Sequence, residues 1–208
     1  MQKFIIMGAQ GCGKGTQSRL LSAQLDLAHI CVGDILRWNI QSRTKLAVRI
    51  RRVVAAGELV PDEIVEQIVQ ERLEQNDGNF GFILDGFPRN IPQAQELDTR
   101  LSWMDRPLQL ALNFCIEPEH LLKRVTGRMT CSDCGAIYNR HFIPTEKRGV
   151  CGQCGSAKLT RRSDDQAKTF SKRLEAYLVE TETLIDCLKG QQKMSTVLVE
   201  DDVAQVFE

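Results

Sequence analysis

Short apolar segments alternate with longer amphipathic segments along most of the chain. The apolar runs have the length of buried strands, and the segments between them place apolar residues at helical intervals, as Leu20, Leu21 and Leu25 do within residues 16–25. The runs cover residues 3–7, 28–31, 82–84, 108–114 and 196–199. Alternation of this kind predicts an α/β fold with a parallel central sheet of five strands.

One segment near the N-terminus departs from this alternation. Residues 34–75 have the pattern of several consecutive helices without an intervening strand, and Gly57 and Pro61 separate those helices. We therefore predict a helical insertion at about residues 31–60.

A second departure lies between residues 127 and 164. Apolar periodicity disappears there, and the composition changes to Cys, Gly, Arg and Thr. An apolar helical stripe returns over residues 168–188. We predict that both insertions fold back against one core, made of residues 1–30, 61–126 and 165–208.

Composition and charge exclude several classes of protein. The chain has 208 residues, of which 42% are hydrophobic and 26% charged, so a disordered or fibrous protein is excluded. Its 27 Lys and Arg balance 27 Asp and Glu, so no overall field favours nucleic acid or membranes, and any anion site must be local. No apolar run reaches the roughly 18 residues of a membrane span, and the apolar start is too short for a signal sequence. We expect a cytoplasmic protein.

A glycine-rich loop follows the first predicted strand. Residues 8–14 have the spacing GxxxxGK, with a strand before them and a helix after them. Glycines let backbone N–H groups converge on phosphate oxygens, the helix N-terminus adds its positive dipole end, and Lys14 reaches the terminal phosphates. An ordinary glycine turn is the alternative. Position 15 is Gly rather than Ser or Thr, and Thr16 follows it.

Four cysteines form two close pairs. Cys131 and Cys134 are separated by 16 residues from Cys151 and Cys154, which is the spacing of a four-cysteine zinc knuckle. Four thiolates leave no open position on a tetrahedral ion, so this zinc would be structural. A redox role for the pairs and a zinc-knuckle nucleic-acid binder are the alternatives.

Several motifs together carry a family resemblance. The chain resembles nucleoside monophosphate kinases, and adenylate kinases in particular, through GKGT with Gln17, GDILR at residues 33–37, DGFPR at residues 85–89 with Gln93, and RSDD at residues 162–165 with Arg173. The resemblance implies a P-loop three-layer fold, an NMP-binding insertion at 31–60 and a zinc-stapled lid at 127–164. It also implies Mg²⁺-dependent transfer of the γ-phosphoryl of ATP to AMP, giving two ADP, by a monomer without a nucleic-acid or membrane partner.

The candidate site residues suit phosphoryl transfer. Charge spreads over the oxygens of the transferring group, so fixed cations matter more than a nucleophile, and the fork of Arg binds phosphate in a bidentate way. The resemblance implies a catalytic set of Lys14, Asp85, Arg89, Arg124, Arg128, Arg162 and Arg173. It implies ATP binding by Gly11, Cys12, Gly13, Lys14, Gly15, Thr16, Arg124 and Arg128. It implies AMP binding by Val32, Arg37, Glu58, Val60, Gly86, Arg89, Gln93, Arg162 and Arg173.

Three carboxylates have expected roles beside these cations. Asp85 follows an apolar strand, where it can hold the water shell of Mg²⁺, although a capping role is the alternative. Asp164 and Asp165 resemble the family's pair that bonds across the closing lid, and helix N-capping would explain them nearly as well.

Some positions depart from the family pattern. Val32 stands where adenylate kinases usually have Thr, so CMP, UMP or GMP is an alternative acceptor, whereas the amide of Gln93 favours adenine. Gln10 replaces a usual Pro, and residues 199–203 lack the usual Gly, Lys or Pro beside the donor base.

The remaining cysteines and histidines carry weaker expectations. Cys12 lies in the phosphate loop, where a positive environment would favour its oxidation. We expect the other single cysteines and His29, His120 and His141 to be structural or surface residues.

Overall fold

A five-stranded parallel sheet forms the centre of the molecule. The computed structural model describes residues 2–147, 149–199 and 203–207. Within these residues the strands stand in the order β2-β3-β1-β4-β8, and every pair is parallel. They are β1 (Lys3–Met7), β2 (Ala28–Cys31), β3 (Phe82–Asp85), β4 (Leu110–Cys115) and β8 (Met194–Leu198). The predicted α/β fold with five parallel strands is confirmed.

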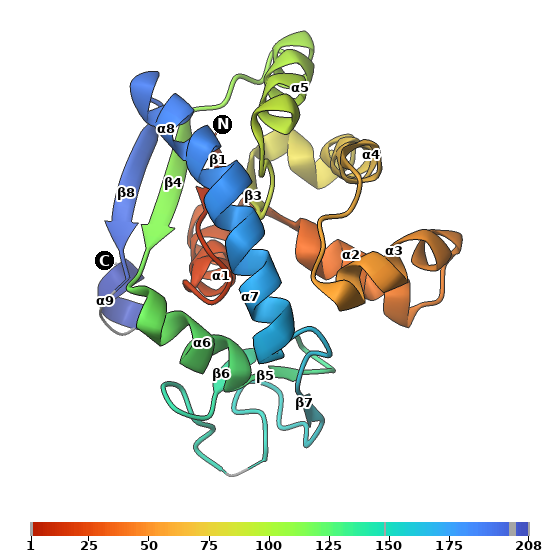
Figure 1. Ribbon diagram of the computed structural model, residues 1–208, viewed down its shortest axis with the longest axis vertical. Coiled ribbons are helices and arrows are strands. Elements are labelled where there is room, and N and C mark those ends of the chain that lie inside the picture. Colours follow the sequence, from red (N-terminus) through yellow and green to blue (C-terminus); the bar gives the residue numbers. More distant parts are fainter. Residues whose placement is uncertain (1, 148, 200–202, 208) are drawn as a thin grey trace.

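Helices connect the strands and cover both faces of the sheet (Figure 1). The connecting and covering helices are α1 (Lys14–Leu25), α4 (Asp62–Leu73), the 3₁₀ turn η1 (Asn76–Phe80), α5 (Ile91–Trp103), α6 (Pro118–Thr126), α7 (Ala167–Ala176), α8 (Glu182–Gly190) and α9 (Val203–Phe207). A parallel connection needs a crossover of this length, which is why each apolar run is followed by a helical segment.

Two hydrophobic clusters occupy the two faces of the sheet. Successive side chains of a strand point to opposite faces, so Ile5 and Met7 belong to one cluster and Ile6 to the other. On β3, Leu84 likewise belongs to the first cluster and Ile83 to the second. Because the inner strands are apolar on both faces, they appear in the sequence as continuous runs.

Both inserted segments project from the carboxyl end of the sheet. The first contains α2 (Val32–Gln41) and α3 (Lys45–Ala56). The second, which we call the lid segment (residues 127–164), contains a small antiparallel sheet of β5 (Arg128–Cys131), β6 (Ile137–Asn139) and β7 (Leu159–Thr160). Figure 1 shows α2 and α3 on one side of the core and the lid segment beneath it. The lid strands are too short to have been recognised from periodicity.

One long helical segment returns the chain from the lid to the core. A π turn over Tyr177–Thr181 joins α7 to α8 without a break. The hydroxyl of Thr181 donates to the carbonyl oxygen of Arg89 at 2.9 Å. The helical stripe predicted at 168–188 is therefore present, with one wider turn in its middle.

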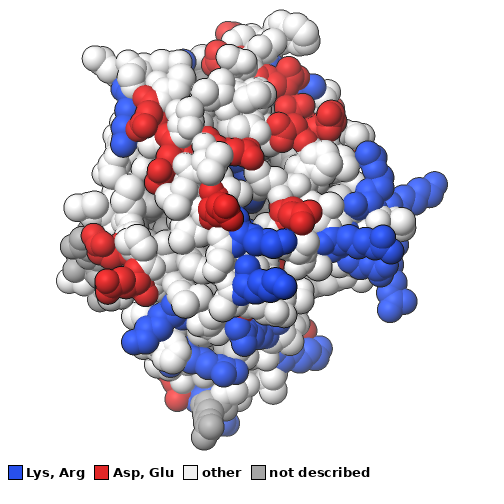
Figure 2. Space-filling view, viewed as in Figure 1, with Lys and Arg blue, Asp and Glu red and all other residues white. Residues whose placement is uncertain are grey.

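Charged side chains are unevenly distributed over the surface (Figure 2). On the face shown, Lys and Arg gather over α3 and the lower half of the molecule, whereas Asp and Glu gather mainly above them, with a second acidic group at the left edge. Among the described residues, no helix combines the length and the apolar character that crossing a membrane requires.

We expect Leu84→Ala to lower the free energy of unfolding by about 2–5 kcal/mol, because it leaves a cavity in an inner strand. Leu84 is 0% exposed, whereas Leu198 on edge strand β8 is 66% exposed. Leu198→Ala is the matched control and should change stability by less than about 0.5 kcal/mol. Urea unfolding measures both, and equal losses would contradict this account of the core.

Candidate active site

The phosphate loop lies between β1 and α1 at the carboxyl edge of the sheet. Gly8, Gly11 and Gly13 have φ angles of 133°, 94° and 100°. A Cβ at Gly8 would lie 2.5 Å from the carbonyl oxygen of Phe114, so only glycine fits there. Gly13 forms the N-cap of α1, so the positive end of this helix faces the loop.

A cavity of about 760 Å³ opens beside this loop. It is lined by the loop and by both inserted segments. The sequence-predicted site residues that line it are Gly11, Gly13, Lys14, Gly15, Thr16, Val32, Arg37, Glu58, Val60, Asp85, Gly86, Arg89, Gln93, Arg124, Arg128, Arg162 and Arg173. One cavity therefore brings together positions from all three predicted regions of the chain.

Cys12 is the exception among the predicted residues. Its thiol is fully buried in the core cluster, and its backbone N–H donates to the carbonyl of Ala9 at 3.3 Å. The left-handed glycines on either side turn this side chain away from the cavity. Burial shields this thiol from solvent, which does not favour the oxidation expected from the sequence.

Lys14 and Asp85 place opposite charges at the base of the cavity. The Lys14 ammonium donates to the carbonyl of Ala9 at 3.0 Å, within its own loop. Burial alone would raise the pKa of Asp85, but His29 and the charge of Lys14 hold it below its usual value. A Cβ on Gly15 would lie 3.3 Å from Asp85 Oδ2, so the glycine at position 15 makes room for this carboxylate.

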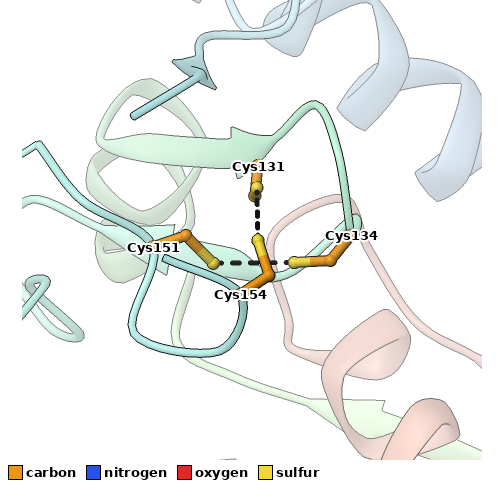
Figure 3. A group of neighbouring side chains, drawn as sticks. All are labelled: Cys131, Cys134, Cys151 and Cys154. Atoms are coloured by element: carbon orange, nitrogen blue, oxygen red, sulfur yellow. Dashed lines mark hydrogen bonds between the residues drawn. The ribbon is translucent and has the colours of Figure 1, made fainter. Parts of the chain in front are cut away.

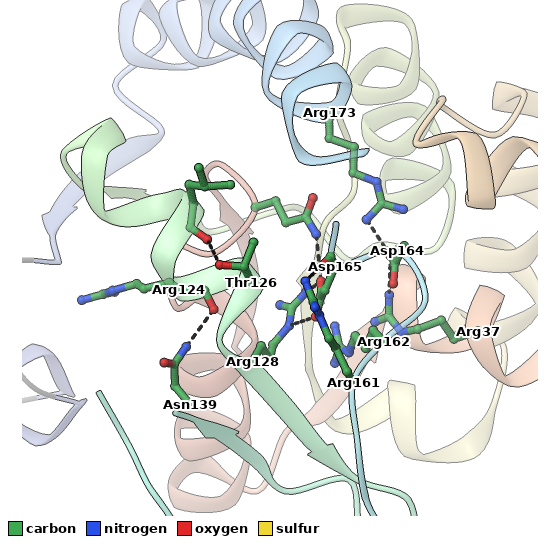
Figure 4. A network of polar contacts seen from close by, with 12 residues as sticks. Arg37, Arg124, Thr126, Arg128, Asn139, Arg161, Arg162, Asp164, Asp165 and Arg173 are labelled. Carbon is green, nitrogen blue, oxygen red and sulfur yellow. Dashed lines mark hydrogen bonds and ion pairs between the residues drawn. The ribbon is translucent and has the colours of Figure 1, made fainter. Parts of the chain in front are cut away.

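Two buried carboxylates bind arginines at the border of the lid segment (Figure 4). Asp165 accepts from Arg128 Nε at 2.8 Å and from Gln10 Nε2 at 3.3 Å. Asp164 accepts from Arg173 Nη1 at 2.7 Å. The N-cap position of the helix that follows is Gln166, so the alternative that these aspartates cap it is not supported within the described chain.

Asp34 connects the helical insertion to the lid segment. Arg162 Nη2 lies 3.6 Å from Asp34 Oδ1, and Arg37 of the same helix also pairs with Asp34. Burial alone would raise the pKa of Asp34, but Arg37, Arg162 and Arg19 hold it well below its usual range. The two inserted segments thus meet over the cavity through charged groups.

The arginines repel one another as well as pairing with carboxylates. Burial, together with the charges of Arg128 and Arg37, lowers the pKa of Arg162 to about 10. Burial and the charge of Arg173 also lower the pKa of Arg89. Both shifts are due first to burial and then to neighbouring positive charge, so an anionic ligand would stabilise these arginines.

Gln93 and Val32 both line the cavity. The Oε1 atom of Gln93 accepts from the backbone N–H of Arg89 at 2.8 Å, and its Nε2 donates to Asp62 Oδ1 at 2.7 Å. An amide offers two N–H groups and two lone pairs, so each end keeps one position for a ligand. Asp62 orients the amide, and the sequence analysis did not identify that role.

Other residues of the cavity were also missing from the sequence prediction. Phe142 of the lid segment lies under Arg124, whose guanidinium carbon is 5.6 Å from the ring centroid. His120 and Tyr138 line the same region. Isolated aromatic and histidine residues give no periodic or spacing signal, so the sequence alone could not single them out.

The four paired cysteines meet within the lid segment (Figure 3). Cys131 Sγ lies 3.6 Å from Cys154 Sγ, and Cys134 Sγ lies 3.5 Å from Cys151 Sγ. Four thiolates around a tetrahedral zinc lie about 3.8 Å apart, so the cluster is compatible with structural zinc.

Two local features hold this cluster. Gly135 and Gly155 each adopt a φ of 74° and donate to the carbonyls of Cys131 and Cys151. The Tyr138 hydroxyl, 3.3 Å from Cys151 Sγ, lowers the pKa of that thiol to about 6. A tight turn therefore follows each cysteine pair.

Comparisons with known proteins agree with this geometry. The family model described as adenylate kinase matches residues 6–193. The chain is 44% identical over 204 residues to an adenylate kinase of Nitrosococcus oceani, covering 98% of this chain and 94% of that protein. It is 42% identical over 205 residues to an adenylate kinase of Thermodesulfovibrio yellowstonii, covering 99% and 95%. With the phosphate loop, the arginine-lined cavity and the four-cysteine lid in place, the chain belongs to the adenylate kinase family.

Proposed function

We propose that the chain works as an adenylate kinase, transferring the γ-phosphoryl of ATP to AMP to give two ADP, through the cavity residues named above. The observation that carries this proposal is the convergence of arginines from the core, the insertion and the lid segment on one cavity beside the phosphate loop. Burial and neighbouring positive charge lower the pKa of Arg162 and of Arg89, and phosphate oxygens would neutralise such charges.

Each end of the cavity suits one substrate. The phosphate loop, Arg124 and Arg128 hold ATP, with the ring of Phe142 beside the donor base. Arg37 and Arg89 hold the phosphate of AMP, and the two free positions of the Gln93 amide pair with adenine. Arg162 and Arg173 lie between these ends and stabilise the charge that develops on the transferring group.

Asp85 is suited to a nucleotide-bound Mg²⁺. Its carboxylate is buried at the base of the cavity beside Lys14, and oxygen ligands are those that Mg²⁺ prefers. When bound, Mg²⁺ would neutralise phosphate charge during transfer. Asp85 would hold that ion through its water shell.

Closure of the inserted segments excludes water from the transfer. Residues 31–60 act as the AMP-binding insertion, residues 127–164 act as the lid, and the remaining residues form the core. Pairing of Arg162 with Asp34 and of Arg128 and Arg173 with the two border aspartates supports this arrangement. A site that is complete only when both segments close loses little ATP to hydrolysis.

The lid holds one zinc ion through its four cysteines. The lid segment buries little apolar surface of its own, so the ion replaces a hydrophobic core. All eight cysteines are free of disulfides, which supports a cytoplasmic location. The core and inserted segments of a single chain line the cavity, which supports a monomer.

We expect Arg162→Ala to reduce kcat by about 10²–10³-fold with a smaller change in KM, because it removes a cation that acts in the transition state. Arg162→Lys should restore part of the rate, since it keeps the charge but loses the planar fork. Arg52→Ala, at an exposed position on α3, is the control. An Arg162→Ala protein that is folded and works within threefold of the native rate would contradict the assigned role.

We expect Val32→Thr to increase selectivity for AMP over CMP, UMP and GMP by about 2–10-fold in kcat/KM, because the new hydroxyl can form one hydrogen bond to the base. Val32 is buried and lines the cavity. Val32→Ala supplies the control without a hydroxyl. If the native chain turns over CMP or UMP as fast as AMP, Gln93 does not set the acceptor and the broader-acceptor alternative holds.

We expect the isolated protein to retain one zinc ion after dialysis, and Cys154→Ser to release it. An ion present at about 100 times its dissociation constant contributes about 2.7 kcal/mol, so the melting temperature should fall by about 5–11 °C. Cys187→Ser, an exposed thiol on α8, is the matched control. Thermal unfolding with metal analysis measures both, and unchanged melting on loss of the zinc would show that it contributes nothing to stability.

A further inference from the structure

A second group of metal-binding side chains lies at the carboxyl ends of β2 and β3. His29 and Cys31 are two residues apart on β2, so their side chains share one face of the sheet. Cys31 stands opposite Asp85 in the parallel register of the two strands. The imidazole nitrogen, the thiol sulfur and a carboxylate oxygen lie within 4.8 Å of one another.

The imidazole of His29 lacks a conventional partner. Its Nε2 atom is buried and has no hydrogen-bond partner among the described residues. The nearest charged group is Asp85 Oδ2 at 3.6 Å, which is beyond hydrogen-bond distance. A buried nitrogen without a partner is costly, and a metal ion between these two atoms would satisfy both.

The donor set indicates which ion fits. Bonds of about 2.0–2.2 Å in a tetrahedral site place a nitrogen and an oxygen ligand about 3.3–3.5 Å apart. The distance from His29 Nε2 to Asp85 Oδ2 is 3.6 Å, close to this range. Nitrogen and thiolate ligands favour Zn²⁺ or Co²⁺, whereas Mg²⁺ prefers oxygen ligands alone.

We propose that His29, Cys31 and Asp85 form a transition-metal site, separate from the four-cysteine cluster, that binds Zn²⁺ or Co²⁺ in the absence of nucleotide. The ion replaces the proton of the Cys31 thiol, which passes to solvent. Cys31 and Asp85 line the cavity, so water or a phosphate oxygen fills the fourth position. All three ligands stand on neighbouring strands of the core sheet, so binding needs no closure of the lid.

Occupation of this site has a consequence that rests on the proposed function. The ion engages the carboxylate that we assign to nucleotide-bound Mg²⁺. Zn²⁺ bound here would therefore slow phosphoryl transfer, even though zinc in the lid supports the fold.

The binding test uses nucleotide-free protein whose lid is filled with zinc, to which Co²⁺ alone is added. We expect the native chain to take up one Co²⁺ with the near-ultraviolet absorption of a thiolate-to-cobalt bond. Cys31→Ser should lose this absorption and bind Co²⁺ at least tenfold more weakly, and His29→Gln should weaken binding while keeping a thiolate. Cys187→Ser should behave as the native chain does. Circular dichroism checks the fold of each variant, and if Cys31→Ser does not fold, His29→Gln decides.

Two results would overturn the metal site. One is a native chain that takes up no Co²⁺ beyond its lid, and the other is folded His29→Gln or Cys31→Ser protein that binds as the native chain does. A separate experiment measures the turnover of the native chain with and without added Zn²⁺. Because ATP also binds zinc, the same measurement on Cys31→Ser shows how much of the inhibition arises without this site. Binding without inhibition would contradict the role of Asp85 toward Mg²⁺ and leave the metal site supported.

Discussion

Mutual repulsion among the cavity arginines is the constraint on which the site depends. Like charges in a partly buried place separate unless something holds them, and here three carboxylates do so from two segments of the chain. Asp34 belongs to the helical insertion, and Asp164 and Asp165 border the lid. The pairs that hold the cations together also join the inserted segments over the cavity.

Different interactions stabilise the core and the lid segment. The core buries two apolar clusters on a rigid sheet, which fixes the phosphate loop and Asp85 in place. The described part of the lid segment has three short strands and four converging thiols, so local turns and the proposed metal ligation would order it. Movement of the lid segment, as proposed above, would therefore change the cavity without disturbing the packing of the sheet.

Local patterns predicted the fold and much of the cavity lining. Apolar runs located the five strands, and the run is most continuous where an inner strand such as β3 is buried on both faces. Fixed spacing located the phosphate loop and the paired cysteines. Side-chain direction was less predictable. Cys12 faces the core because of its glycine neighbours, and His29 meets Asp85 only through the register of two strands. The contact between Arg162 and Asp34 spans most of the chain, so no local pattern could reveal it.

The π turn at Tyr177–Thr181 sets the rotational phase of the helix that leaves the lid. In a regular α-helix, residues four apart drift by about 40° around the axis, and a wider turn reduces this drift. Arg173, Tyr177 and Thr181, each four residues from the next, all line the cavity. Loss of one residue from this turn would rotate α7 by about 100° relative to α8. Arg173 would then point away from Asp164. The length of this turn therefore helps to direct Arg173 toward the cavity.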